Sequence, residues 1–251
     1  MTDNVLYTYV VRLADDAIIL SQRLSEWCGH ASHIEEDVAL SNIALDLIGQ
    51  ARILYSHAAR LEGKGRTEDD ICFFRVERQY TNCLLVEQPN ADFAVTITRQ
   101  LFFSAFMLPF WTALKSSGDV ILSGLAAKAE KEVAYHLRHS SEWFIRLGDG
   151  TPESHSRIEA AVDGLWMYTG ELFDVDEITA GLVKRGLAID PETLRSEWNE
   201  TINAVLARAT ISRPDDCWMQ IGGRSGEHTE HLGHLLSPMQ YLQRSYPGET
   251  W

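Results

Sequence analysis

The chain has 251 residues, of which 45% are hydrophobic and 23% charged, and its formal net charge is −14 at pH 7. This composition is that of a globular protein long enough to bury a substantial core. The acidic balance argues against non-specific nucleic-acid binding, which requires basic surface to neutralise phosphates.

The first two long segments have apolar residues three or four positions apart, which is the spacing of amphipathic helices. They run from Leu6 to Trp27 and from about Ile34 to Leu61. A charged, glycine-containing break, EGKGRTEDD, separates them from a shorter helix that we expect over about 70–87.

Two further long stripes follow, from Phe93 to Trp111 and from Leu122 to Phe144. Pro109 lies inside the first of these, so we expect a kink or an early end of that helix. The run LFFSAFMLPFW is the most apolar part of the chain, but it is too short to cross a bilayer and predicts a buried helix.

The helical pattern weakens beyond residue 151 but persists. Asp190-Pro191 places proline at the first position of a helix, where its missing N–H costs nothing. We expect helices over 157–172, 176–185, 191–209 and, within an otherwise irregular tail, about 228–245.

No segment alternates in the manner of a strand, and no internal repeat is found. We therefore predict an all-α protein, a ferritin-like four-helix bundle with additional C-terminal helices. The whole chain, 1–251, forms one domain in this prediction, with the core bundle over about 3–148 and the extra helices and tail over 151–251.

The four cysteines show no CxxC pair and no zinc-binding spacing, which is typical of reduced cytosolic thiols. The N-terminus lacks a basic segment followed by a long apolar run, so we expect no signal peptide and a cytoplasmic protein without a membrane segment. The cysteines are Cys28, Cys72, Cys83 and Cys217.

A metal centre would be the natural content of such a bundle. Ferritin-like di-iron bundles hold their ions with one Glu from each of two helices and a Glu-x-x-His pair from each of the other two. This chain contains no Glu-x-x-His. The four stripes instead carry Ala17, Leu47 with Gln50, Ser104, and Val133 with His136 at the positions where ligands are expected.

Leucine, alanine and valine cannot bind a metal, and Gln50 is a neutral donor that leaves the charge of two ions uncompensated. His136 alone is not a site, and a histidine on an apolar helix face is more often a hydrogen-bonded core residue. We predict that Gln50, Glu132 and His136 form a buried hydrogen-bond network, with a trapped water as an equally good alternative.

A second histidine cluster lies in the C-terminal segment GEHTEHLGH. His228, His231 and His234 are three residues apart, so successive side chains drift around a helix and do not easily face one ion. The pattern is not the His-Glu-x-x-His of zinc proteases. A docked C-terminal segment or a partner-binding surface is favoured over a surface metal site.

Hydrolase and phosphate-binding functions have little support. No G-x-S-x-G nucleophile elbow is present. Arg99, Arg138 and Arg146 are candidates for contacting a phosphate, although single arginines on helices are more often solvated or ion-paired.

Several motifs along the whole chain resemble those of the bacterial ring-1,2-phenylacetyl-CoA epoxidase (phenylacetate-CoA oxygenase) family, and most closely those of its structural C-type chains. The motifs are RLSEWCGH, EEDVALSNIALDLIGQAR, LLVEQPNADFAVTITRQLFF, KEVAYHLRHSSEW and GGRSGEHTEHLGHLLSPMQYLQRSYPG. Metal-binding relatives read Asp-Asp-Glu where this chain has Asp15-Asp16-Ala17, and Asp-Glu-x-Gly-His where it has Asp46 to Gln50.

The resemblance implies a structural role beside a catalytic partner. In that family the A subunit holds the di-iron centre and epoxidises the aromatic ring of phenylacetyl-CoA, and a reductase subunit supplies electrons from NADPH. The C subunit pairs with A and supports it. This implies no catalytic residue, cofactor or metal in the present chain.

Two alternatives remain open. One is a metal-binding oxygenase that uses unconventional ligands such as Glu36, Glu132 and His136. The other is a hydrolase or ligand-binding bundle that works without a partner.

Overall fold

The structure, a computed structural model, describes residues 3–216 and 218–249, so Cys217 lies outside the described residues. Over those ranges the chain folds into helices and connecting loops without a strand, which confirms the predicted all-α class. The residues divide into two compact units, one formed by 1–89 with 222–251 and the other by 90–221. The expected single domain stays a prediction.

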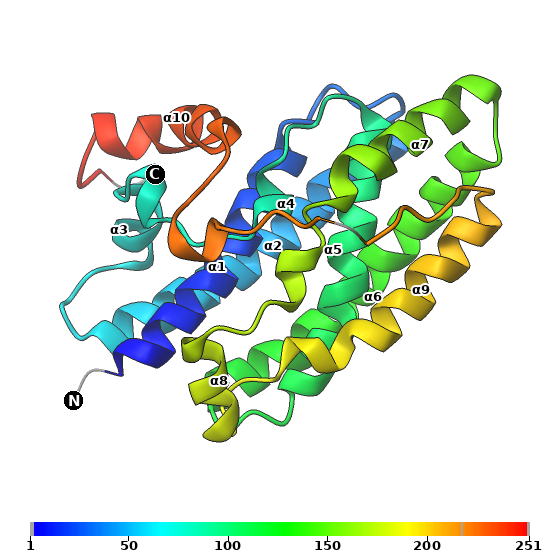
Figure 1. The fold of residues 1–251 in the computed structure, drawn as a ribbon. Coiled ribbons are helices and arrows are strands. Elements are labelled where there is room, and N and C mark those ends of the chain that lie inside the picture. The colour runs from blue at the N-terminus through cyan, green and yellow to red at the C-terminus, as the bar shows by residue number, and fades with distance from the viewer. Residues whose placement is uncertain (1–2, 217, 250–251) are drawn as a thin grey trace. The chain divides into compact units, whose positions relative to one another are not determined.

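Unit 1 is built on two long packed helices, α1 (Asn4–Ser25) and α2 (Ile34–Glu62), drawn in blue and light blue in Figure 1. The Asp3 carboxylate caps α1 by accepting a hydrogen bond from the Leu6 N–H at 3.1 Å. Gly63, in the left-handed conformation with φ 67°, ends α2. The predicted stripes are buried except at Trp27, which lies beyond the end of α1 and is only half-buried. The buried positions are Leu6, Val10, Leu13, Ala17, Leu20 and Leu24 on α1, and Leu40, Ile43, Leu47, Gln50 and Leu54 on α2.

The prediction of one helix over about 70–87 is wrong. The segment folds as α3 (Glu68–Phe73), a 3₁₀ turn (Glu77–Gln79) and α4 (Leu84–Glu87). The backbone N–H groups of Thr81 and Cys83 donate to carboxylates of α1, at 2.7 Å in each case. These tertiary hydrogen bonds replace the ones that a continuous helix would make within itself.

The C-terminal segment completes unit 1. It contains a short 3₁₀ turn (Gly223–Ser225) and α10 (Glu230–Ser245), which lies beside α3 in Figure 1. Gln240 and Arg244 of α10 both donate to the Arg75 carbonyl, at 2.9 and 2.7 Å. The predicted last helix is thus present and packed on the N-terminal part of the chain.

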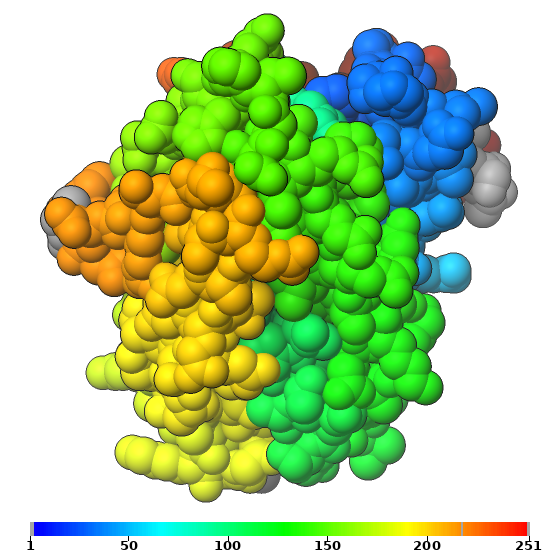
Figure 2. Space-filling model, turned by 90° about the vertical axis from the view of Figure 1, so that its right-hand side faces the viewer, coloured from blue at the N-terminus to red at the C-terminus, as the bar shows by residue number. Residues whose placement is uncertain are grey.

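Unit 2 is built on α5 (Phe93–Leu114) and α6 (Val120–Gly148), joined by α7 (Pro152–Trp166), α8 (Glu177–Lys184) and α9 (Arg195–Arg208). Figure 2 shows α9, in yellow, lying beside the green helices of this unit. An aromatic cluster fills the space between α5, α7 and α9, and the Trp198 indole donates to the Phe102 carbonyl at 3.0 Å. The cluster comprises Phe102, Trp166, Phe173 and Trp198.

The apolar helix α5 differs from expectation in two respects. It does not end early at Pro109 but continues to Leu114, so that part of the prediction was wrong, and whether its axis bends stays a prediction. Its length and composition would also allow it to cross a membrane, which contradicts the expectation from the sequence. However, 83% of the apolar stretch that meets this criterion is buried inside the protein. That burial agrees with the predicted buried helix.

Candidate functional site

The positions where α1 and α2 were expected to lack ligands are all in the interior. Ala17, Leu47 and Gln50 are almost fully buried. The first two have no atom that binds a metal, and Gln50 offers only a neutral amide. This part of unit 1 therefore supplies no carboxylate from the three positions.

Unit 2 buries the other three positions. Ser104, Val133 and His136 lie in the interior on α5 and α6. The Gln100 amide donates to the Ser104 hydroxyl at 2.8 Å. The Ser140 hydroxyl donates to the His136 carbonyl, also at 2.8 Å. The network predicted between Gln50, Glu132 and His136 stays a prediction.

The donor set does not fit the di-iron centre that the fold family implies. Within the described ranges 3–216 and 218–249, no three His, Cys, Asp or Glu side chains gather where they could hold one ion. Glu132, one of the alternative ligands, forms an ion pair with Lys128 at 3.0 Å. Glu36 and His136, the other two, are buried on α2 and α6. We therefore derive no metal chemistry for this chain.

The acidic groups of α1 instead hold the fold together. Asp15 is fully buried and accepts hydrogen bonds from the Tyr55 hydroxyl at 2.6 Å, the Thr81 N–H at 2.7 Å, and both terminal nitrogens of Arg75. Burial raises the pKa of Tyr55 well above 10.0, and the negative charge of Asp15 adds to this rise. Tyr55 therefore serves as a neutral hydrogen-bond donor.

The neighbouring Asp16 fastens the C-terminal segment. Its two carboxylate oxygens accept from Nη1 and Nη2 of Arg224, at 2.9 and 2.8 Å, and one of them also accepts from the Cys83 N–H. Arg224 Nη1 donates to the Thr81 carbonyl at 3.0 Å as well. One bidentate pair thus joins α1 to the 3₁₀ turn at Gly223–Ser225.

A third buried acid, Glu87, holds the same segment. It accepts from His228 Nδ1 at 2.7 Å, from the Thr229 N–H at 2.7 Å, and from the Asn82 amide at 2.8 Å. His228 Nε2 lies 2.9 Å from the Tyr80 carbonyl. Both ring nitrogens thus face acceptors, which is the arrangement that an imidazolium satisfies.

The charge state of His228 follows from two opposing effects. Burial alone lowers the pKa of His228, but the hydrogen bond and the negative charge of Glu87 outweigh it and raise the pKa above 6.5. The raised pKa favours the protonated histidine, which has an N–H for both Glu87 and the Tyr80 carbonyl.

The three C-terminal histidines have separate surroundings. His228 contacts Glu87, the His231 carbonyl accepts from Arg23 at 3.3 Å, and His234 is exposed. The ring of His228 is committed to structural contacts and does not face a shared ion. This geometry matches the predicted docked C-terminal segment.

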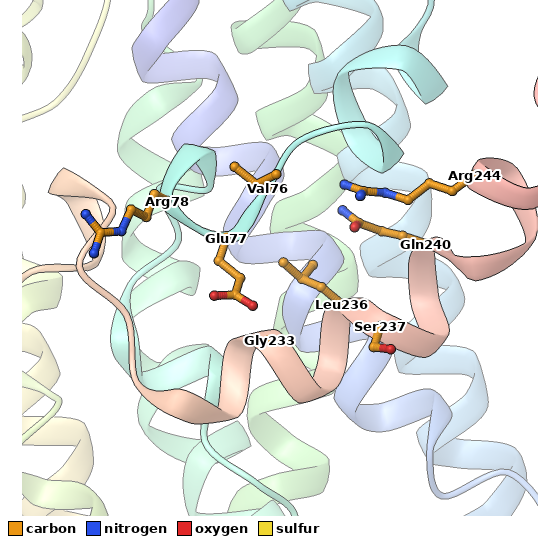
Figure 3. Close-up of a pocket in the computed structure, with 8 residues that line it drawn as sticks. All are labelled: Val76, Glu77, Arg78, Gly233, Leu236, Ser237, Gln240 and Arg244. Carbon is orange, nitrogen blue, oxygen red and sulfur yellow. The ribbon is translucent and has the colours of Figure 1, made fainter.

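The docked segment leaves a hollow between α10 and the 3₁₀ turn at Glu77–Gln79, shown in Figure 3. Its volume is about 450 Å³. The Gly233 backbone lies against the Glu77 carboxylate, which a side chain at position 233 would meet. The lining residues are Val76, Glu77, Arg78, Gly233, Leu236, Ser237, Gln240 and Arg244.

A second hollow of about 560 Å³ adjoins Glu77 and Arg78 on the side of residues 225–230. Its one histidine, His228, is already bound to Glu87.

The structural roles of Asp15, Asp16 and Glu87 were not predicted from the sequence. A signal was present, because two adjacent acids interrupt the apolar pattern of the first helix where a buried charge requires a partner. The identities of those partners, Arg75 and Arg224, could not be read from spacing, since they lie 60 and 208 residues away.

Among the phosphate-binding candidates, Arg99 is fully buried and donates to the Asn90 side chain at 2.7 Å. Arg138 and Arg146 lie over the rings of Tyr135 and Trp143, with the guanidinium carbon 5.5 and 4.6 Å from the ring centres. Each arginine thus has a structural contact of its own.

Comparison with known proteins agrees with the motif resemblance. The family model described as phenylacetic acid catabolic protein matches residues 1–251. The chain is also 50% identical over 248 residues to the C subunit of 1,2-phenylacetyl-CoA epoxidase from Escherichia coli (strain K12), with 99% of this chain and 100% of the relative covered. An all-α, ferritin-like fold is consistent with that family. The chain belongs to the phenylacetic acid catabolic protein family.

Proposed function

We propose that this chain is a non-catalytic structural subunit of a cytoplasmic 1,2-phenylacetyl-CoA epoxidase complex. It pairs with a catalytic A subunit that carries the di-iron centre, and the complex includes a reductase subunit. The full-length match to the C subunit of such an epoxidase supports this proposal.

The observation that carries the proposal is the use of the α1 carboxylates. Asp15 and Asp16 accept hydrogen bonds from Arg75 and Arg224, and their negative charge is balanced by these arginines. The next residue, Ala17, has no donor atom. The two carboxylates of α1 therefore stabilise the fold through their arginine partners, and neither is left to balance the charge of a metal ion.

Iron analysis of the chain purified alone from iron-replete cells tests the non-catalytic role. We expect iron well below one equivalent per chain, and no epoxidation of phenylacetyl-CoA when NADPH and the reductase subunit are added. Co-expression with the catalytic A subunit should give a stable heteromer and restore epoxidation. Stoichiometric iron in the isolated chain, or epoxidation without the A subunit, would support the alternative of an oxygenase with unconventional ligands.

A further inference from the structure

One face of α2 exposes an apolar stripe. Ile34, Val38, Leu45 and Ile48 are 75%, 54%, 63% and 40% exposed. At 100° per residue they fall within about 80° of one another around the helix axis. The buried stripe of α2 lies on the opposite side, so the exposed residues, here called the α2 stripe, are not needed for the core of unit 1.

A hollow of about 200 Å³ adjoins the end of the α2 stripe at Ile48. It is several times larger than a water molecule, which occupies roughly 30 Å³ in the liquid, and therefore admits a side chain. Apolar groups of Ile18, Ile48 and Ala51 line it, and α3 contributes Glu68 and Asp69.

The charge beside this hollow is predominantly negative. Burial raises the pKa of Asp69, and repulsion from Glu68 adds to this effect. Arg52 lies 3.3 Å from Glu68 and offsets part of the charge. A further cation placed in the hollow would be attracted to Asp69.

The acidic surroundings favour a partner of opposite charge over a second copy of this chain. Two copies joined through the α2 stripe would bring together two molecules that each carry a net charge of −14. Like charges brought together in an interface oppose association. A basic partner meets no such repulsion.

We propose that the α2 stripe and the adjoining hollow form the docking surface for the catalytic subunit of the complex. The partner would present an apolar helix face with a lysine or arginine. Its aliphatic stem would enter the hollow, and its charge would lie beside Glu68 and Asp69. This proposal rests on the proposed function and assigns a surface to it.

Leu45→Glu tests the apolar part. Leu45 lies in the middle of the α2 stripe, and its substitution should weaken binding to the purified catalytic subunit at least 30-fold, as loss of a central apolar contact does. Val120→Glu is the matched control, because Val120 is 82% exposed but lies at the start of α6 in unit 2. Its affinity should stay within 2-fold of wild type.

Asp69→Lys tests the charged part. It should weaken binding about 10-fold or more at low salt, with a smaller effect at high salt, because charges at an interface rim are screened. Circular dichroism and the midpoint of unfolding should be unchanged for both variants, which separates lost binding from lost folding.

The outcomes distinguish the surface from the function. If wild type does not bind the catalytic subunit, the proposed function fails. If wild type binds and both Leu45→Glu and Asp69→Lys bind equally well, the docking surface is wrong and the function stands. Self-association of the wild type alone that Leu45→Glu abolishes would assign the stripe to a second copy and overturn the proposal.

Discussion

Asp16 and Arg224 are 208 positions apart in the chain and form a bidentate ion pair in which both carboxylate oxygens accept from the guanidinium, at 2.9 and 2.8 Å. The Asp16 side chain is 4% exposed, so the carboxylate depends on this cation. The pair is the strongest link between the C-terminal segment and α1 that the described hydrogen bonds reveal.

Arg224→Ala should therefore destabilise the protein by about 2–3 kcal/mol, because it leaves a buried carboxylate without its counter-charge. Urea unfolding followed by circular dichroism measures the change. Lys64→Ala is the control from the same unit, since Lys64 is exposed and its partner Glu62 keeps Arg66. It should cost less than about 1 kcal/mol. Equal effects would mean that Asp16 does not rely on Arg224.

The His228–Glu87 contact should make stability depend on pH. The pKa of His228 is raised above its ordinary value of 6.5 in the folded protein, so the folded chain binds a proton more tightly than the unfolded chain does. This contribution is fully present below about pH 6.5 and is lost as pH rises through the raised folded pKa. Unfolding free energies measured from pH 6 to 9 should show that fall.

His228→Gln should remove this part of the pH profile, because glutamine does not titrate. His234→Gln is the matched control, since His234 is exposed and belongs to the same motif. Its profile should coincide with that of wild type. A titration of the His228 ring by NMR with a pKa below 6.5 would contradict the expected sign.

Gly226→Ala should lower stability by more than about 2 kcal/mol. Gly226 has φ +78°, and an added Cβ would lie 2.3 Å from the Arg78 carbonyl, so both backbone strain and a clash oppose alanine. Gly164→Ala is the comparison: Gly164 is inside α7 with open space around it. That change should be neutral or stabilise by up to about 1 kcal/mol. Thermal unfolding of both variants measures the contrast.

Trp198→Ala should cost about 3–5 kcal/mol, because it empties the centre of the aromatic cluster in unit 2 and removes the hydrogen bond to the Phe102 carbonyl. Trp218→Ala, at a 63% exposed tryptophan in the same unit, should change stability by less than about 0.5 kcal/mol. Chemical unfolding monitored by circular dichroism compares them without relying on tryptophan fluorescence.

Gln50→His alone should bind no more iron than wild type. The new imidazole would be buried, and the other two vacated positions in unit 1, Ala17 and Leu47, would still provide no carboxylate to balance the charge of a ferrous ion. Metal analysis after loading with Fe²⁺ under anaerobic conditions measures this. Iron bound at one equivalent or more would show that the ligand positions were assigned to the wrong residues.

The long helices could be predicted because their apolar stripes are regular. All seven positions from Leu122 to Phe144 on the predicted stripe are buried on α6. The 70–87 segment could not, because its composition allows a helix, while its loops are fixed by hydrogen bonds to distant residues, among them Asp15, Asp16 and Gln240. Tertiary contacts there override the local preference.

Some features of the candidate site could likewise be predicted from the sequence, and others could not. The absence of ligands at Ala17 and Leu47 is visible in the sequence, because chemistry excludes those side chains as donors. The role of His228 is not, since its partner Glu87 lies 141 residues earlier and nothing in the local GEHTEHLGH pattern points to it. The exposed α2 stripe is also hidden, because apolar residues on both sides of a helix blur its periodicity.

The return of residues 222–249 to the N-terminal unit has a consequence for how the protein is made. Residues 90–221 form a contiguous stretch and can fold as soon as they leave the ribosome, whereas Asp16 and Glu87 must wait for Arg224 and His228, which are synthesised after that whole stretch. A nascent or prematurely terminated chain therefore carries acids that lack their cations. The N-terminal unit is complete only once residues 222–249 have been synthesised, so chains that end before this segment should be more sensitive to proteases.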